Sequence, residues 1–191
     1  MKNQLAPEDK TYLLSLARKT IEHAVNHRPL PSWKESEVSA DMQAKGATFV
    51  TLTMDGELRG CIGTLEAHQS LIEDVREHAY QSALEDYRFP PVTAGEISRL
   101  HIEISRLTAP EPLPYSKAED LPGLLHPGED GVVLKDGFRR ATFLPQVWEQ
   151  LPDVGEFLSH LCVKMGASAD LWRRKVLEVS VYHVEEFEEP K

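Results

Sequence analysis

The sequence predicts an α+β protein with a largely antiparallel sheet. Two hairpin patterns, each with an Asp-Gly pair, occur at residues 47–64 and 131–144. A helical pattern follows each hairpin, and the hairpins outnumber any strand-helix-strand pattern of the kind that forms a parallel sheet. We therefore expect two hairpin-plus-helix units.

The first element is a helix over residues 7–27, with Pro7 tolerated in its first turn. Apolar residues recur at the i, i+3, i+4, i+7 spacing that gives a helix one buried face, and they are Leu13, Leu16, Ala17, Thr20, Ile21 and Ala24. Residues 28–39, which contain two prolines, are expected to form an irregular connection.

The hairpin at residues 47–64 allows two registers. A two-residue Asp55-Gly56 loop would mix polar and apolar side chains on both faces, because Thr53 would pair with Leu58 and Leu52 with Arg59. An odd-length loop with Gly56 in the left-handed region gives one apolar face, made of Val50, Leu52, Leu58 and Ile62. The other face then carries Thr51, Thr53, Arg59 and Cys61. We favour the odd-length loop because it buries no unpaired charge.

The middle of the chain is expected to form a helix and a half-buried strand. Residues 70–85 match a capping box, Ser70 to Glu73, followed by the buried stripe Leu71, Ile72, Val75 and Ala79. Residues 100–107 alternate: one face has Leu100, Ile102 and Ile104, and the other has His101, Glu103 and Ser105.

The last third repeats the pattern of hairpin and helix. After a proline-rich connection come the second hairpin, a helix with the stripe Phe157, Leu158, Leu161 and Cys162, and Gly166 as its C-cap. Residues 176–184 form a last strand, and residues 185–191 are expected to be a solvated acidic tail. The two hairpins show either a weak internal repeat or a chance similarity. The first has Asp55-Gly56 followed by Arg59-Gly60, and the second has Asp136-Gly137 followed by Arg140-Ala141.

Composition excludes several classes of protein. The chain has 191 residues, with 21 Lys+Arg against 31 Asp+Glu and a net charge of −10, which fits one domain or two small ones. The longest stretch without a charged residue runs from Gly46 to Met54, whereas a membrane span needs about 20 apolar residues. The first ten residues lack the apolar region of a secretory signal, so we expect a cytoplasmic protein without a membrane segment and with reduced cysteines. The absence of a basic run disfavours nucleic acid as the main ligand.

The segment Arg59-Gly60-Cys61-Ile62-Gly63-Thr64 departs from a plain strand. Glycines inside a strand indicate a bulge or the close approach of another backbone or a ligand. Arg59 and Cys61 would share a face about 7 Å apart in Cα position, and a nearby cation favours the nucleophilic thiolate. The alternative is that Cys61 is a small buried side chain that only packs.

Other chemistry-bearing patterns are weak. His23 and His27 have i, i+4 spacing on a helix, which either ligates a metal or places cationic histidines at the helix end. His160 and Cys162 do not share a helix face. No phosphate loop, GxGxxG or serine nucleophile elbow is present. We therefore expect neither a metal nor a cofactor.

Residues 58–64, Leu-Arg-Gly-Cys-Ile-Gly-Thr, resemble the signature of the AMMECR domain family. Further segments resemble the family in order and extend the similarity to about residues 10–187: Asp86-Tyr87-Arg88-Phe89-Pro90-Pro91, Leu100 to Ser105, Phe143 to Val147 and the region of Trp172. The chain departs from the family pattern at Ala141, where glycine is usual, and at Lys164 to Ala167, where Lys-Ala-Gly-Leu is usual.

The resemblance implies a single AMMECR-type domain over residues 1–191 in two parts, of which the larger gathers both chain ends, with a cleft near the hexapeptide Arg59–Thr64. The bacterial branch is called AmmeMemoRadiSam system protein A, because its genes sit beside those of a Memo-like protein and a radical SAM enzyme. The resemblance implies no established reaction. Cys61 and Glu103 become candidate catalytic residues; the candidate ligand contacts are Arg59, Gly60, Gly63, Thr64, Asp86, Arg88 and Gln146.

Each of these candidates has a structural alternative. Asp86 and Arg88 either pair on the surface or reach the cleft, and Glu103 either faces solvent or acts as an acid or base beside Cys61. Two hypotheses follow for the whole protein. It is a Cys61-dependent enzyme or ligand-processing domain for an unknown small molecule, or it is a non-catalytic adaptor for the Memo-like and radical SAM proteins.

Overall fold

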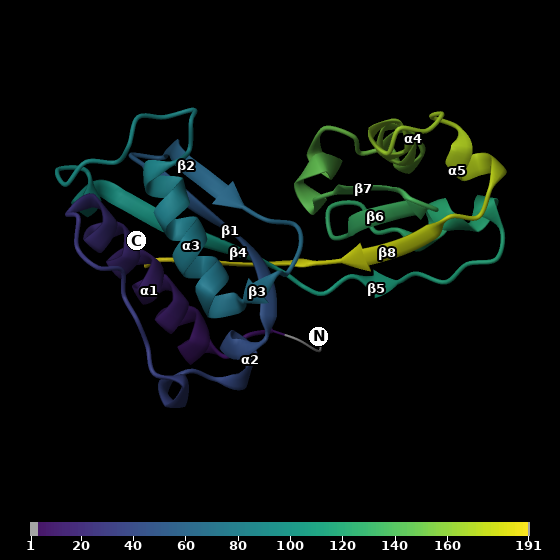
Figure 1. The fold of residues 1–191 in the computed structure, drawn as a ribbon. Helices are drawn as coiled ribbons and strands as arrows, with labels where there is room; N and C mark the ends of the chain where they lie inside the picture. Colours follow the sequence, from purple (N-terminus) through teal and green to yellow (C-terminus); the bar gives the residue numbers. More distant parts are fainter. Residues whose placement is uncertain (1–3, 191) are drawn as a thin grey trace. The chain divides into compact units, whose positions relative to one another are not determined.

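Two separate hydrophobic cores divide the computed structural model, which describes residues 4–190, into two units. The larger unit contains residues 4–108 and 185–190, and the smaller unit is the insertion 109–184. Both are built from helices and antiparallel strands (Figure 1), so the α+β class, with a larger part that gathers both end segments, is confirmed.

The larger unit is a sheet with two helices on one face. Strands β1 (Lys45–Met54), β2 (Glu57–Gly63), β4 (Leu100–Leu107) and β9 (Val184–Glu188) form the order β2-β1-β4-β9, and the short β3 (Gln69–Ser70) pairs with the start of β1. Helices α1 (Pro7–Val25) and α3 (Leu71–Leu84) pack on this sheet and on each other (Figure 1). Short turns of helix, η1 (Glu35–Glu37), α2 (Ala40–Gln43) and η2 (Ile97–Arg99), lie in the connections.

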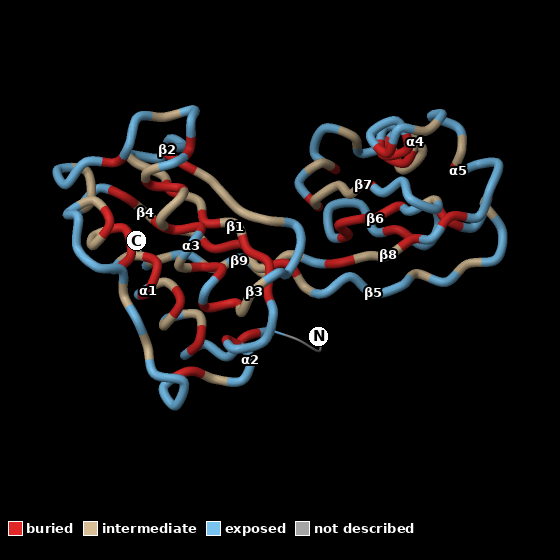
Figure 2. The backbone as a smooth tube through the Cα atoms, viewed as in Figure 1, coloured by how far each residue is buried: buried red, intermediate tan, exposed pale blue. Residues whose placement is uncertain are grey.

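The predicted apolar stripes form the core of this unit. All six stripe residues of α1 and all four of α3 are buried, together with Val50, Leu52, Ile102 and Ile104 of the strands (Figure 2). The capping box predicted for α3 is absent, because the Ser70 hydroxyl donates to the Glu73 carboxylate and caps no backbone N–H. The short helix α2 was not predicted; Ser39 begins it by accepting a hydrogen bond from the Met42 N–H.

The preferred odd-length loop in the first hairpin is wrong, and the expected faces are right for β1 and for Cys61 and Ile62 but wrong for Leu58 and Arg59. Met54 pairs with Glu57, so the loop is the two residues Asp55 and Gly56, both with positive φ. The register then shifts between Leu52 and Thr53, and Leu52 pairs with Gly60. A β-bulge at Arg59 thus supplies the extra residue that we had placed in the loop. Leu58, expected on the buried face, is 43% exposed.

The expected acidic tail is an ordered strand, which corrects the prediction for residues 185–191. β9 (Val184–Glu188) forms the edge of the sheet beside β4, and Lys191 lies outside the described residues. Glu185 contacts Lys10 and Arg106, and Glu189 contacts Arg18. The acidic residues are therefore held by cations from α1 and β4, which come from sequence positions too distant for a local pattern to reveal.

The smaller unit is a sheet of order β5-β8-β6-β7 with its own core. Its elements are β5 (Glu111–Pro112), η3 (Ala118–Leu124), β6 (Gly131–Asp136), β7 (Arg139–Phe143), η4 (Pro145–Glu149), α4 (Val154–Lys164), α5 (Leu171–Arg174) and β8 (Glu178–Tyr182). The predicted α4 stripe is buried, and Gly166, with φ of 78°, ends this helix as expected.

The two hairpins differ at their turns, which counts against an internal repeat. In the first, Asp55 and Gly56 are the central residues of the loop. In the second, Asp136 pairs with Arg139, so the loop is Gly137 and Phe138. The Asp-Gly pairs therefore occupy different positions relative to their strands.

Candidate functional site

All of the hexapeptide except Thr64 lies on β2, an edge strand of the larger sheet, with Cys61 on the face away from α3. Cys61 pairs with Thr51 of β1, and the Thr51 hydroxyl donates a hydrogen bond of 3.4 Å to the Cys61 Sγ. The side chain is partly exposed, whereas the other thiol, Cys162, is fully buried in the smaller unit. Cys61 is thus the accessible thiol of the described chain.

Arg59 does not lie beside Cys61 on the open face, because the bulge turns its side chain into the protein. The residue is 8% exposed. Its Nε donates to Glu96 Oε1 at 2.8 Å, and its Nη1 donates to the Pro90 carbonyl at 2.9 Å. The guanidinium lowers the pKa of Glu96 to about 2. Arg59 is therefore held in an internal ion pair, and a role for it in ligand binding stays a prediction.

The two glycines of the hexapeptide are approached by the protein itself. A Cβ at Gly60 would lie 2.2 Å from the Ser82 carbonyl oxygen of α3, and one at Gly63 would lie 2.4 Å from the Thr48 carbonyl oxygen. Any larger residue would therefore separate β2 from its helix or from β1. Close backbone packing accounts for both glycines without a ligand.

Asp86 and Arg88 form a clamp on the free edge of β2, because they bind the backbone N–H and the carbonyl of Cys61. Asp86 Oδ2 accepts a hydrogen bond of 2.9 Å from the Cys61 N–H, and Arg88 Nη2 donates one of 3.0 Å to the Cys61 carbonyl. The two side chains also form a direct ion pair at 2.6 Å. They therefore pair with each other and also reach the hexapeptide.

Hydrogen bonds within this clamp shift the pKa values of both Asp86 and Arg88. Asp86 is 4% exposed, and the hydrogen bonds from Arg88 hold the pKa of its carboxyl far below the ordinary value. Asp86 raises the pKa of Arg88 in turn, with a smaller contribution from Cys61. The Arg88 side chain is 43% exposed, so it is the partly exposed cation next to Cys61.

Glu103 lies in the same row of the sheet as Cys61. Thr51 pairs with Cys61 of β2 on one side and with Glu103 of β4 on the other. Burial, and then the charges of Glu186 and Glu188, raise the pKa of the Glu103 carboxyl. The sheet therefore places a thiol, a hydroxyl and a carboxyl with raised pKa side by side across three strands.

The remaining predicted residues are Thr64 and Gln146. The Thr64 N–H donates to the Thr48 carbonyl at 3.0 Å, and the Thr64 hydroxyl donates to the Glu66 carbonyl at 3.3 Å. Gln146 is an exposed residue of η4 in the smaller unit. Within residues 4–190, no group of three or more histidine, cysteine or acidic side chains is arranged to hold a metal ion.

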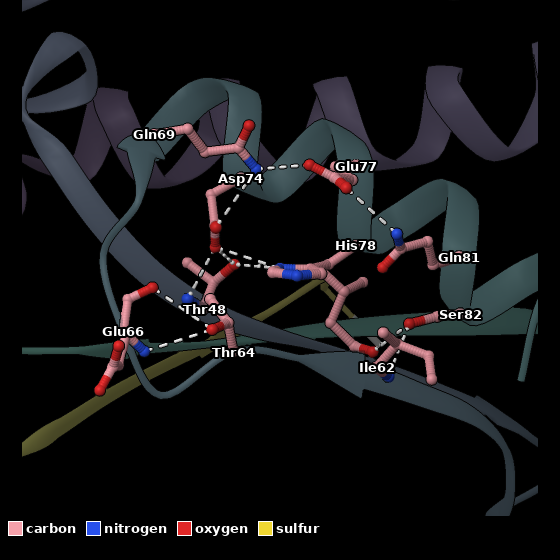
Figure 3. A network of polar contacts seen from close by, with 11 residues as sticks. Thr48, Ile62, Thr64, Glu66, Gln69, Asp74, Glu77, His78, Gln81 and Ser82 are labelled. Carbon is pink, nitrogen blue, oxygen red and sulfur yellow. Dashed lines mark hydrogen bonds and ion pairs between the residues drawn. The ribbon is translucent and has the colours of Figure 1, made fainter.

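A buried polar network on α3 was missed by the sequence analysis. Asp74 Oδ2 accepts hydrogen bonds from the Thr48 N–H at 2.8 Å and the Thr48 hydroxyl at 2.7 Å, and it lies 3.1 Å from His78 Nδ1 (Figure 3). The signal that could have revealed it is the i, i+4 spacing of Asp74 and His78 within the predicted helix. The pair faces β1, between apolar residues that suggested a purely hydrophobic stripe.

Comparison with known proteins shows the family. Residues 14–187 match the AMMECR1 family, and the chain belongs to it. Protein Mbar_A1807 of Methanosarcina barkeri is 38% identical over 179 residues, which cover 92% of this chain and 88% of that one. Protein MJ0810 of Methanocaldococcus jannaschii is 34% identical over 186 residues, covering 97% and 92%.

A solved structure shares the architecture. The crystal structure of the uncharacterized protein PH0010 from Pyrococcus horikoshii matches with a TM-score of 0.76 and 32% identity, covering 97% of this chain and 93% of that chain. Among the described residues, no helix has the length and apolar character needed to span a bilayer.

Proposed function

We propose that this AMMECR1-family protein processes a small anionic ligand with the Cys61 thiol as nucleophile. The observation that carries the proposal is the clamp at Cys61: Arg88 donates to its carbonyl while keeping part of its own side chain exposed. Neighbouring cations increase the reactivity of a thiol, and an exposed guanidinium recognises carboxylates or phosphates. Arg88 thus takes the role that the sequence analysis gave to Arg59.

Thr51 and Glu103 complete this proposed site. The Thr51 hydroxyl donates to Sγ, which stabilises negative charge on sulfur in the thiolate. Glu103, with its raised pKa, is the candidate acid or base for a ligand that lies across β1 from Cys61 to β4.

Alkylation of the folded protein by iodoacetamide near neutral pH tests the nucleophile. We expect Cys61 to react much faster than Cys162, whose pKa is raised by burial. Mass spectrometry of peptides from timed samples measures both rates, and a Cys61→Ser variant assigns the fast one. Slow labelling of both thiols at similar rates would refute the proposal.

A second candidate is a non-catalytic adaptor for a Memo-like protein and a radical SAM protein. It is favoured by the internal use of Arg59, Gly60 and Gly63, which makes the hexapeptide a structural framework for the edge of the sheet. Co-expression with each partner followed by size-exclusion chromatography tests it. Co-elution supports the adaptor, and separate elution at concentrations of about tens of micromolar, well above the dissociation constant of a stable complex, counts against it.

A further inference from the structure

An open groove of about 630 Å³ lies in the larger unit, between the C-terminal end of α1 and the connection from α3 to β4. Its volume falls in the range of about 300–1,000 Å³ that is usual for small-molecule sites. Arg18, Glu22 and the C-cap Asn26 are four residues apart, so they line the groove from one face of the helix. Arg28 lines it after the helix end. The connection contributes residues that include Ile97 and Ser98.

The Arg18 guanidinium is already bound within the protein. Its Nη1 donates to the Ile97 carbonyl at 2.7 Å, and its Nη2 donates to the Leu100 carbonyl at 2.8 Å. Its Nε and Nη2 also donate to the two carboxylate oxygens of Glu189. The charge of Arg18 is therefore neutralised inside the fold, and this side chain forms a wall of the groove.

Glu22 and Arg28 differ from Arg18, because their charged groups have no partner among residues 4–190. The described chain makes no hydrogen bond or ion pair with the Glu22 carboxylate or the Arg28 guanidinium, and the two groups do not contact each other. Only their backbones are used: the Glu22 carbonyl accepts from Asn26 Nδ2 at 2.7 Å, and the Arg28 N–H donates to the His23 carbonyl at 2.8 Å. One negative and one positive group thus line the same groove uncompensated.

The helix itself does not account for Glu22. This residue lies in the last turn of α1, which ends at Val25, and the negative end of the helix dipole disfavours a carboxylate there. A ligand cation beside Glu22 would be stabilised by the carboxylate and by the helix end together. The Arg28 guanidinium recognises carboxylates. The groove therefore offers one position for a cation and another for an anion.

Neutral polar groups line the same groove. Asn26 Nδ2 is used by the Glu22 carbonyl, which leaves Asn26 Oδ1 to accept a hydrogen bond from a ligand N–H. Ser98 is exposed, and its hydroxyl can donate to a ligand carbonyl. An acceptor and a donor of this kind match the two polar groups of a peptide bond.

We propose that this groove binds a short zwitterionic peptide, with the terminal ammonium group against Glu22 and the terminal carboxylate against Arg28. The peptide amides contact Asn26 and Ser98. Two opposite charges at separate positions select for both ends of the ligand and set its direction. The groove shares no residue with the proposed site at Cys61, so failure of one proposal leaves the other intact.

Triglycine is the probe, and two blocked forms are its controls: N-acetyl-triglycine lacks the ammonium group, and triglycine amide lacks the carboxylate. Proton–nitrogen correlation NMR of the full chain follows each titration at the Asn26 side-chain amide and the Ser98 backbone amide. We expect triglycine to shift both signals and to bind about threefold to fivefold more tightly than either control, which is what one exposed ion pair contributes. Equal affinities of all three compounds, or no shift, would overturn the proposal.

Two substitutions assign the ends of the peptide. In Glu22→Gln, triglycine and N-acetyl-triglycine should bind equally, because the ammonium group has lost its carboxylate; in Arg28→Gln, triglycine and triglycine amide should bind equally. Lys19→Gln is the matched control, since Lys19 is an exposed α1 residue outside the groove, and it should keep both preferences. A variant that retains the preference it is expected to lose would refute the assigned contact.

Thermal unfolding separates ligand binding from support of the fold. We expect Glu22→Gln to melt at the wild-type temperature or slightly above it, because the change removes a carboxylate from the negative end of α1. A clear fall in the melting temperature of this variant would show that Glu22 has a structural role, and it would count against the proposal.

Discussion

Arg59 Nε donates a 2.8 Å hydrogen bond to Glu96 Oε1, at the residue where hairpin β1–β2 departs from regular pairing. The bulge explains why the Arg59 side chain can reach Glu96. The extra residue in β2 has no partner across the strand, so its side chain is free to turn toward Pro90 and Glu96. The most prominent cation of the hexapeptide thereby becomes part of the fold.

Replacing Arg59 with alanine should lower the free energy of unfolding by about 1–3 kcal/mol, because the Pro90 carbonyl loses its side-chain donor and the partly buried Glu96 keeps only its hydrogen bonds from Thr93. Urea unfolding followed by circular dichroism measures the loss. Arg99→Ala is the matched control, since Arg99 forms an exposed pair with Asp55 and should cost no more than about 1 kcal/mol. Equal stability of both variants would mean that the ion pair contributes little.

The Glu96 ion pair should make stability depend on pH in acid. The pKa of Glu96 falls from its ordinary value of 4.5 to about 2 in the folded protein, so its contribution is complete above about 4.5 and is lost as the pH falls through about 2. The difference in unfolding free energy between wild type and Glu96→Gln should therefore be constant near neutral pH and shrink in that acid window. Glu119→Gln, at an exposed glutamate, should show no such trend.

Gly60→Ala should destabilise the protein by about 2 kcal/mol or more, because the new Cβ would lie 2.2 Å from the Ser82 carbonyl oxygen and would push α3 from β2. Thermal unfolding of the two proteins checks this. Gly95→Ala is the control: its Cβ would meet nothing within 4 Å, and its melting temperature should stay close to that of the wild type. A Gly60→Ala protein as stable as the wild type would show that strand and helix can separate at little cost.

Arg88→Gln should slow the alkylation of Cys61 about threefold to tenfold, since it removes the positive charge beside the thiol. Timed labelling with iodoacetamide near neutral pH gives the rate. Arg99→Gln removes an exposed arginine of the same unit and should leave that rate unchanged. Circular dichroism must show that both variants are folded, and an unchanged rate in folded Arg88→Gln would exclude Arg88 as the activating cation.

Local patterns were sufficient for most of the secondary structure. The apolar spacing of α1, α3 and α4 and the alternation of β4 are set by which residues of one element are buried. The signature around Cys61 likewise marked the right strand, because two glycines inside a strand require a close approach. It did not reveal that Ser82 and Thr48 make that approach.

The candidate site depended on contacts between distant positions. Asp86 with Cys61 and Thr51 with Glu103 are brought together only by the turn after α3 and by the pairing of β1 with β4. Cys61 and Glu103 were both chosen from the sequence, but their common row across Thr51 follows from register. The Asp74–His78 pair was overlooked because a polar pair inside an apolar helix face has meaning only once Thr48 is opposite it.

By itself, the sequence determined the α+β class, the helices and strands that carry strong periodicity, and the segment around Cys61 as the part of the chain most unlike ordinary strand. Tertiary structure alone decided that Arg59 turns inward to Glu96 and that the acidic end becomes strand β9. It also decided that Arg88 is the partly exposed cation beside Cys61. The physical reason is that periodicity reports the burial of each residue within its own element. The partner of a charge or of a strand edge is instead set by chain segments that only folding brings together.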